Sequence, residues 1–191
     1  MKLLITAFEP FGGDSINASW EAVKALPKQI GRWELTQLCL PVEFGRAGEI
    51  ALVKAKEINA DAVICVGQAA GRSEITPEFI GINLRHAAIP DNAGFQPQDA
   101  PIAPDGPAAY FSTLPVRQMA QAISECGIPA KVSYTAGAYV CNDILYTLLH
   151  RMTSSSVPAG FIHVPPTPAQ SQPSMTTERC VQGLIAAIEA I

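Results

Sequence analysis

Short apolar runs alternate along the chain with segments whose apolar residues recur every three or four positions. Runs that are apolar at nearly every position are typical of strands covered on both faces, as in a parallel sheet. The runs of strand length span residues 2–7, 35–40, 62–66, 131–135 and 160–164. We therefore expect five strands, most of them parallel and buried, from these runs.

The segments between these runs show the spacing of amphipathic helices. One helix is expected over 45–58, one follows Pro115, and one forms the end of the chain. Ser19 is expected to be the N-cap of a further helix that stops at Pro27. Strands and helices in alternation predict an α/β fold, a three-layer α/β/α sandwich around a mostly parallel, open twisted sheet.

Composition narrows the classes of protein that fit. The chain has 191 residues, of which 48% are hydrophobic and 16% charged, which excludes a disordered chain. At roughly 150 residues per domain, we expect a single domain over residues 1–191. The net charge of −4 argues against a nucleic-acid partner, and the apolar stretches are too short for a membrane span. With no targeting segment in the sequence, a cytoplasmic location is expected.

The five cysteines are Cys39, Cys65, Cys126, Cys141 and Cys180, an odd number without close pairs, which argues against a disulfide framework or a zinc ribbon. Cys141 differs from the rest because it follows a turn of small residues and starts an expected helix. The positive end of a helix dipole and its free N–H groups favour a thiolate and are able to receive an oxyanion. For the other four we expect packing in the core.

His163 comes at the end of the last expected strand, where parallel α/β sheets bind their ligands. A histidine at that edge is placed for general base catalysis, and a cysteine–histidine pair needs a third group that orients the imidazole. The carboxylates near strand ends are Glu9, Glu74, Glu78 and Asp143, and spacing does not decide among them. The glycines after the strands match neither GxxxxGK[ST] nor GxGxxG, so no phosphate site is indicated.

Several motifs, in order along the chain, resemble pyroglutamyl peptidase I, a family of cysteine peptidases: FEPFGGDSIN, VGQAAGRSEITPE, IPDN, AYVCND and GFIHVPPTP. The resemblance implies an α/β/α sandwich and removal of N-terminal pyroglutamate from peptides. By motif, Cys141 corresponds to the nucleophile, His163 to the base and Glu78 to the carboxylate that orients it. It also implies a homo-oligomer, tetramer or dimer, that needs no metal ion and no cofactor.

The resemblance further places a group of residues against the pyroglutamyl ring. Because pyroglutamate is an uncharged lactam, its pocket is expected to be apolar, with a few polar groups that read the ring N–H and C=O. A pair of phenylalanines suits the flat ring, and a site built to bind the lactam carbonyl rejects proline. The residues carried over in this way are Phe8, Phe11, Gln68, Ile89, Tyr139 and Val140.

The chain departs from the family pattern at positions next to these motifs. Ala88 stands where the family usually has arginine, Phe79 where arginine is common, and Asp143 where histidine is usual. These changes make the local charge more negative, which raises the pKa of a nearby cysteine, and Arg85 is a candidate replacement for the missing arginine. Two alternatives therefore stay open: a lactam-binding homologue with little turnover, and a thiol amidohydrolase of different specificity.

Overall fold

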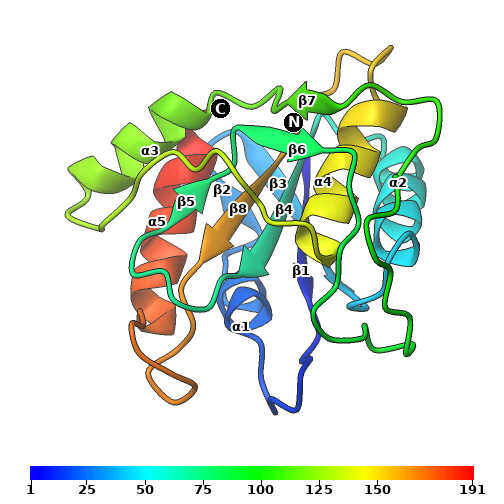
Figure 1. Cartoon of the computed structure of the whole chain (residues 1–191). Helices are drawn as coiled ribbons and strands as arrows, with labels where there is room; N and C mark the ends of the chain where they lie inside the picture. Colours follow the sequence, from blue (N-terminus) through cyan, green and yellow to red (C-terminus); the bar gives the residue numbers. More distant parts are fainter.

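The computed structural model describes residues 1–191 and contains a six-stranded sheet with the strand order β2-β3-β1-β4-β8-β5. The four central strands run parallel, and the short edge strands β2 and β5 are antiparallel to their neighbours (Figure 1). The strands span β1 (Lys2–Phe8), β2 (Gln29–Ile30), β3 (Trp33–Leu40), β4 (Ala62–Gln68), β5 (Thr76–Pro77) and β8 (Ala159–Val164).

Helices cover both faces of this sheet. On one face lie α1 (Ala18–Lys24), α3 (Val116–Glu125) and α5 (Thr177–Glu189), and on the other lie α2 (Arg46–Ile58) and α4 (Val140–Arg151) (Figure 1). A separate two-stranded sheet, β6 (Ile80–Ile82) with β7 (Ala109–Phe111), packs against α4. The predicted three-layer α/β/α sandwich with a mostly parallel sheet is confirmed.

The apolar runs become strands because both of their faces are buried. Leu3 and Ile5 of β1 belong to a cluster of 27 buried residues on the side of α1 and α5, while Leu4 belongs to a cluster of 18 on the side of α4. Successive side chains of a strand point to opposite faces, so an unbroken apolar run serves both clusters at once. No helix of the protein is both long and apolar enough to cross a bilayer.

The expected strand over 131–135 is wrong. This segment runs beside β5, but only two isolated bridges on either side of β5 join the two stretches, Ile75 with Ala130 and Glu78 with Ser133. Its ladder begins with Lys131 N–H donating to Ile75 O and continues with Ser133 N–H donating to Pro77 O. Between them Pro77 has no N–H to give, so the ladder is interrupted at its centre.

The helix whose N-cap is expected to be Ser19 is capped two residues earlier. Asn17 is its N-cap and accepts a hydrogen bond from the Ser19 amide at 3.0 Å, while the Ser19 hydroxyl donates to the same oxygen at 2.8 Å. The Ser19 hydroxyl also accepts from the Phe8 amide at 3.3 Å. Ser19 therefore joins the helix to the end of β1. Asn17 supplies the acceptor for the Ser19 amide, which has no backbone partner in the first turn of the helix.

The parallel strands β1, β4 and β8 end side by side, at Phe8, Gln68 and Val164. The chain leaves all three at the same edge of the sheet, which is the lower edge in Figure 1. Helix α4 begins there too, with Val140 as its first residue. The fold thus gathers loops from distant parts of the sequence where ligands bind in open α/β sheets.

Candidate active site

Cys141 is the second residue of α4, and its sulfur lies directly above β4. A Cβ atom on Gly67 would come within 2.9 Å of Cys141 Sγ and 2.6 Å of the Phe161 ring. Only glycine leaves room at this point, because a non-hydrogen atom that close would displace the sulfur or the ring. Gly67 is also the register partner of His163 on β8, so one glycine brings thiol and imidazole together.

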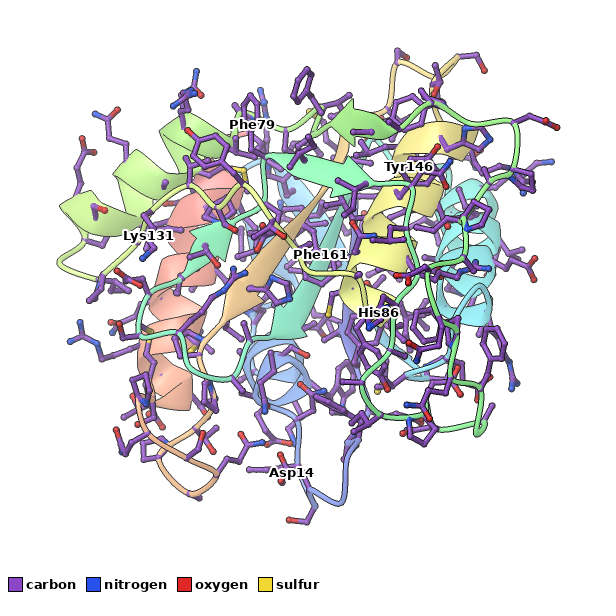
Figure 2. The ribbon with its side chains drawn as sticks, viewed as in Figure 1. Asp14, Phe79, His86, Lys131, Tyr146 and Phe161 are labelled. Carbon is purple, nitrogen blue, oxygen red and sulfur yellow. The ribbon has the colours of Figure 1, made fainter.

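His163 is buried at the end of β8, and its Nδ1 lies 2.7 Å from Glu78 Oε1. Its ring contacts Phe161, with 4.8 Å between ring centroids, and Figure 2 shows Phe161 in the middle of the molecule over the strands. Glu78 directly follows β5, whose Thr76 pairs with His163 in the sheet. The carboxylate therefore holds the imidazole at Nδ1, which leaves Nε2 for the cavity.

A cavity of about 300 Å³ opens beside the thiol and the imidazole. Its wall is mostly apolar, and Arg72 is the only Asp, Glu, Lys or Arg among its lining residues. From the predicted site it includes Phe8, Phe11, Gln68, Tyr139, Val140, Cys141 and His163. Glu78 lies behind His163 without lining the cavity.

Ile89 is the predicted ring-binding residue that does not line this cavity. Its side chain is 46% exposed, and its Cδ1 atom would lie 3.7 Å from a Cβ on Gly12. The neighbouring Pro90 carbonyl accepts a hydrogen bond from the Tyr139 hydroxyl at 3.1 Å. The segment around Ile89 thus contacts the cavity wall from outside through the backbone hydrogen bond to Tyr139, while the Ile89 side chain is largely exposed to solvent.

Gln68 presents a defined polar atom to the cavity. Its Oε1 accepts hydrogen bonds from the Ala18 amide at 2.7 Å and from Gln170 Nε2 at 3.0 Å. With the oxygen engaged, the side-chain NH₂ has no protein acceptor. An apolar cavity with one free amide donor suits a neutral ligand that carries a carbonyl group.

Burial determines the charges of the thiol and the imidazole. Desolvation and the Glu78 carboxylate raise the pKa of Cys141 to about 12, against the lowering effect of Arg72. Desolvation lowers the pKa of His163 below 6.5, although Glu78 opposes it. The site at neutral pH therefore holds a neutral thiol next to a neutral imidazole, and the helix N-terminus does not produce a resting thiolate.

Alkylation measures this protonation state. With the pKa of Cys141 raised to about 12, its reaction with iodoacetamide should accelerate about tenfold per pH unit from pH 7 to 9, because only the thiolate attacks. Peptide mapping by mass spectrometry, with the exposed Cys39 and Cys126 replaced by serine, follows the one site. A plateau below pH 8 would contradict the neutral thiol.

Asp143 does not act as an added negative charge beside the thiol. Its side chain is fully buried and pairs with Arg85 Nε at 2.5 Å, while the other oxygen accepts from the Gly45 amide at 2.6 Å. Arg85 thereby neutralises Asp143, so it does not replace the arginine missing at position 88. Of the nearby carboxylates, it is Glu78 that raises the pKa of Cys141.

Phe79 and two of the cysteines lie away from the cavity. Phe79 lies near the top of the molecule in Figure 2. It packs against Phe111 and Tyr134, with Arg117 over its ring. Core packing was the wrong expectation for Cys39 and Cys126, which are exposed: Cys39 lies near the outer edge of the sheet on β3, and Cys126 is the C-cap of α3. No three His, Cys, Asp or Glu side chains are grouped so that they could hold a metal ion.

Arg72 is the residue at this site that the sequence interpretation missed. It lies in the loop between β4 and β5, lines the cavity, and forms a 2.6 Å ion pair between its Nη1 and Glu78 Oε1. The signal was present in the sequence, because Arg72 is a cation close behind a strand end in a chain with few charges. Only the fold shows that it meets Glu78.

The similarity of this chain to known proteins extends over its whole length. The model of the pyroglutamyl peptidase family matches residues 1–191. The pyrrolidone-carboxylate peptidase of Levilactobacillus brevis is 50% identical over 198 residues, which cover 100% of this chain and 97% of that protein. That of Thermococcus kodakarensis is 46% identical over 197 residues, which cover 100% of this chain and 96% of the relative.

Solved structures agree with these relatives. Pyrrolidone carboxyl peptidase from Thermococcus litoralis superposes with a TM-score of 0.94 at 40% identity, covering 99% of this chain and 92% of that one. Pyroglutamyl peptidase I from Bacillus amyloliquefaciens gives a TM-score of 0.93 at 41% identity, covering 99% and 94%. Matched from end to end by sequence and by fold, this chain belongs to the pyroglutamyl peptidase family.

Proposed function

We propose that this protein is a cysteine peptidase that removes N-terminal pyroglutamate from peptides, with Cys141 as nucleophile, His163 as general base and acid, and Glu78 as the group that orients His163. The observation that carries the proposal is the meeting of thiol and imidazole on one apolar cavity, with Glu78 2.7 Å behind the imidazole. Membership of the pyroglutamyl peptidase family, whose activity this is, supports it.

The proposed reaction starts from the neutral pair. As Cys141 Sγ attacks the carbonyl carbon of the pyroglutamyl residue, its proton passes to His163 Nε2. The carbonyl oxygen becomes an oxyanion next to the Cys141 amide, which donates to no backbone carbonyl. The C–N bond then breaks, and His163 returns the proton to the departing amine.

A thioester on Cys141 remains after the peptide has left. His163, again neutral, takes a proton from water while the water oxygen attacks the thioester carbon. Breaking of the C–S bond releases pyroglutamate and restores the thiol. Glu78 stabilises the imidazolium that forms in each half-reaction and keeps Nε2 directed at the cavity.

Selectivity provides the test of this function. The free NH₂ group of Gln68 is proposed to donate to the lactam carbonyl, which proline lacks. A pyroglutamyl amide should therefore be cleaved with a kcat/KM on the order of 10⁴-fold above that of the prolyl amide, since a site built for a hydrogen bond rejects the analogue without it. A chromogenic amide assay measures the ratio.

The same assay distinguishes the alternatives. Preferred cleavage of a glutaminyl or prolyl amide would indicate a thiol amidohydrolase of different specificity. Tight binding of pyroglutamate by calorimetry without hydrolysis would indicate a lactam-binding homologue. The Asp143–Arg85 ion pair weakens the argument for that homologue, because the charge that motivated it is neutralised.

The remaining expectations about partners and location stay proposals. Peptides with N-terminal pyroglutamate are the proposed substrates, and neither a nucleic acid nor a membrane is proposed as a partner. We further propose one domain over residues 1–191 that assembles into a homo-oligomer, tetramer or dimer, in the cytoplasm. Light scattering of the purified protein measures its oligomeric state.

A further inference from the structure

Arg72 links the loop after β4 to the group that orients the proposed base. Its Nη1 donates to Glu78 Oε1 and to Thr76 Oγ1, both at 2.6 Å, and its Nη2 donates to the Thr135 carbonyl at 2.9 Å. These bonds use the planar fork of the guanidinium, which a lysine does not reproduce. Arg72 is thereby held between β5 and the segment that forms one wall of the cavity.

We propose that Arg72 is a positioning residue that keeps His163 neutral by supplying the fixed counter-charge to Glu78. The proposal rests on the proposed function, because it assigns His163 the role of general base. It goes beyond the cysteine, histidine and glutamate of that mechanism. It adds an arginine that acts through Glu78 without itself reacting.

The burial and the hydrogen bonds of the Glu78 carboxylate show why it needs Arg72 as a partner. Its side chain is fully buried, and Oε1 contacts both His163 Nδ1 and Arg72, while Oε2 has no hydrogen-bond partner. A buried carboxylate requires a nearby positive charge. With Arg72 present that requirement is met, and the imidazole remains neutral and able to accept a proton.

Without Arg72, the nearest source of positive charge is His163 itself. Protonation of the imidazole would then neutralise Glu78, so His163 would hold its proton at a higher pH. The charged or titratable groups that face His163 are Glu78 after β5, Arg72 after β4 and Cys141 on α4. Arg72 lowers the pKa of both His163 and Cys141, in the direction expected of a nearby cation.

The departures from the family pattern leave this task to Arg72. Position 88 holds alanine in place of the arginine that the family resemblance predicts. Arg85 is committed to Asp143. Arg72 is thus the one arginine that lines the cavity and also pairs with the proposed catalytic groups.

The experiment compares pH profiles of kcat/KM for the wild type, Arg72→Gln and Arg72→Lys. For Arg72→Gln we expect the acidic limb to move up by about one pH unit, the effect of a unit charge at this range, so that kcat/KM well below the wild-type midpoint falls about tenfold. Arg72→Lys keeps the positive charge, so its acidic limb should move by no more than about a third of a pH unit. Arg46→Gln is the matched control, because Arg46 pairs with Glu43 on the surface.

A second measurement does not depend on turnover. In the Cys141→Ser background, NMR follows the titration of His163, whose signal is identified by its loss in His163→Gln. The pH midpoint should rise on Arg72→Gln. It should rise by less between Glu78→Gln and Glu78→Gln/Arg72→Gln, because no carboxylate is left there for Arg72 to neutralise. Arg72→Met, which keeps most of the side-chain volume, replaces Arg72→Gln where that variant does not fold.

The outcomes separate the two proposals. An unchanged His163 midpoint or an unmoved acidic limb on neutralisation of Arg72 overturns the role of Arg72, since a merely structural arginine would affect only yield and stability. An equal rise with and without the Glu78 carboxylate would show that Arg72 does not act through Glu78. A raised midpoint in a protein that cleaves no pyroglutamyl amide keeps the role of Arg72 and rejects the proposed function.

Discussion

Replacement of Cys141 by alanine should lower kcat on a pyroglutamyl amide at least about 10⁴-fold, because the proposed thioester cannot form without the sulfur. The rest of the cavity stays in place, since the side chain lost is small and lies at the cavity surface. The variant should therefore still bind pyroglutamate, with a dissociation constant within about threefold of the wild type. Steady-state kinetics and calorimetry measure the two quantities.

Cys126→Ser is the matched control for this variant. Cys126 is exposed at the end of α3 and does not line the cavity, so its replacement should leave kcat unchanged. Cys141→Ala that retained a tenth of the wild-type kcat would remove Cys141 as the nucleophile. The remaining cysteines do not line this cavity and offer no replacement within it.

Gly67→Ala should reduce kcat about 100-fold, although Gly67 carries no reactive group. The added methyl would lie 2.6 Å from the Phe161 ring and 2.9 Å from Cys141 Sγ, so the sulfur has to move away from its place above β4. Displacement of a reacting atom by about 1 Å costs on the order of 10²-fold in rate. Overpacking should also destabilise the fold by about 1–3 kcal/mol.

Gly160→Ala separates the two effects of the Gly67 variant. Gly160 is also buried in the sheet, on β8, and its added methyl would lie 2.6 Å from Leu114 Cδ1, far along the strand from the thiol. Chemical denaturation should show a comparable loss of stability, whereas kcat per folded molecule should stay within about threefold of the wild type. Equal losses of kcat in both variants would show that Gly67 does not position the sulfur.

The positions of Cys141 and His163 show how the fold produces the site. The thiol comes from the first turn of α4 and the imidazole from the end of β8, so their meeting depends on the packing of α4 against the sheet. Gly67 permits that packing by leaving the face of β4 open under the sulfur. The reactive pair therefore requires glycine at position 67 as well as the side chains of Cys141 and His163.

Sequence patterns alone predicted the α/β class, the four parallel strands and the helices, because apolar periodicity is a local property that burial in layers preserves. The exception shows the limit: residues 131–135 read as a strand, but their pairing depends on Pro77, far away in the chain, which interrupts the ladder. The expected elements also singled out two residues by position, Cys141 at the start of a helix and His163 at the end of a strand.

Tertiary structure decided which charges act on this pair. From spacing, Glu9, Glu74, Glu78 and Asp143 were equal candidates, and the family motif pointed to Glu78. The antiparallel pairing of β5 with β8 puts Glu78 beside His163, while Asp143 turns to Arg85. Likewise only the fold brings Arg72 to Glu78. The sequence by itself determined the elements and the reactive residue types. Their charge partners depended on contacts across the chain, which local pattern does not encode because a side chain's neighbours in space are set by strand order and register.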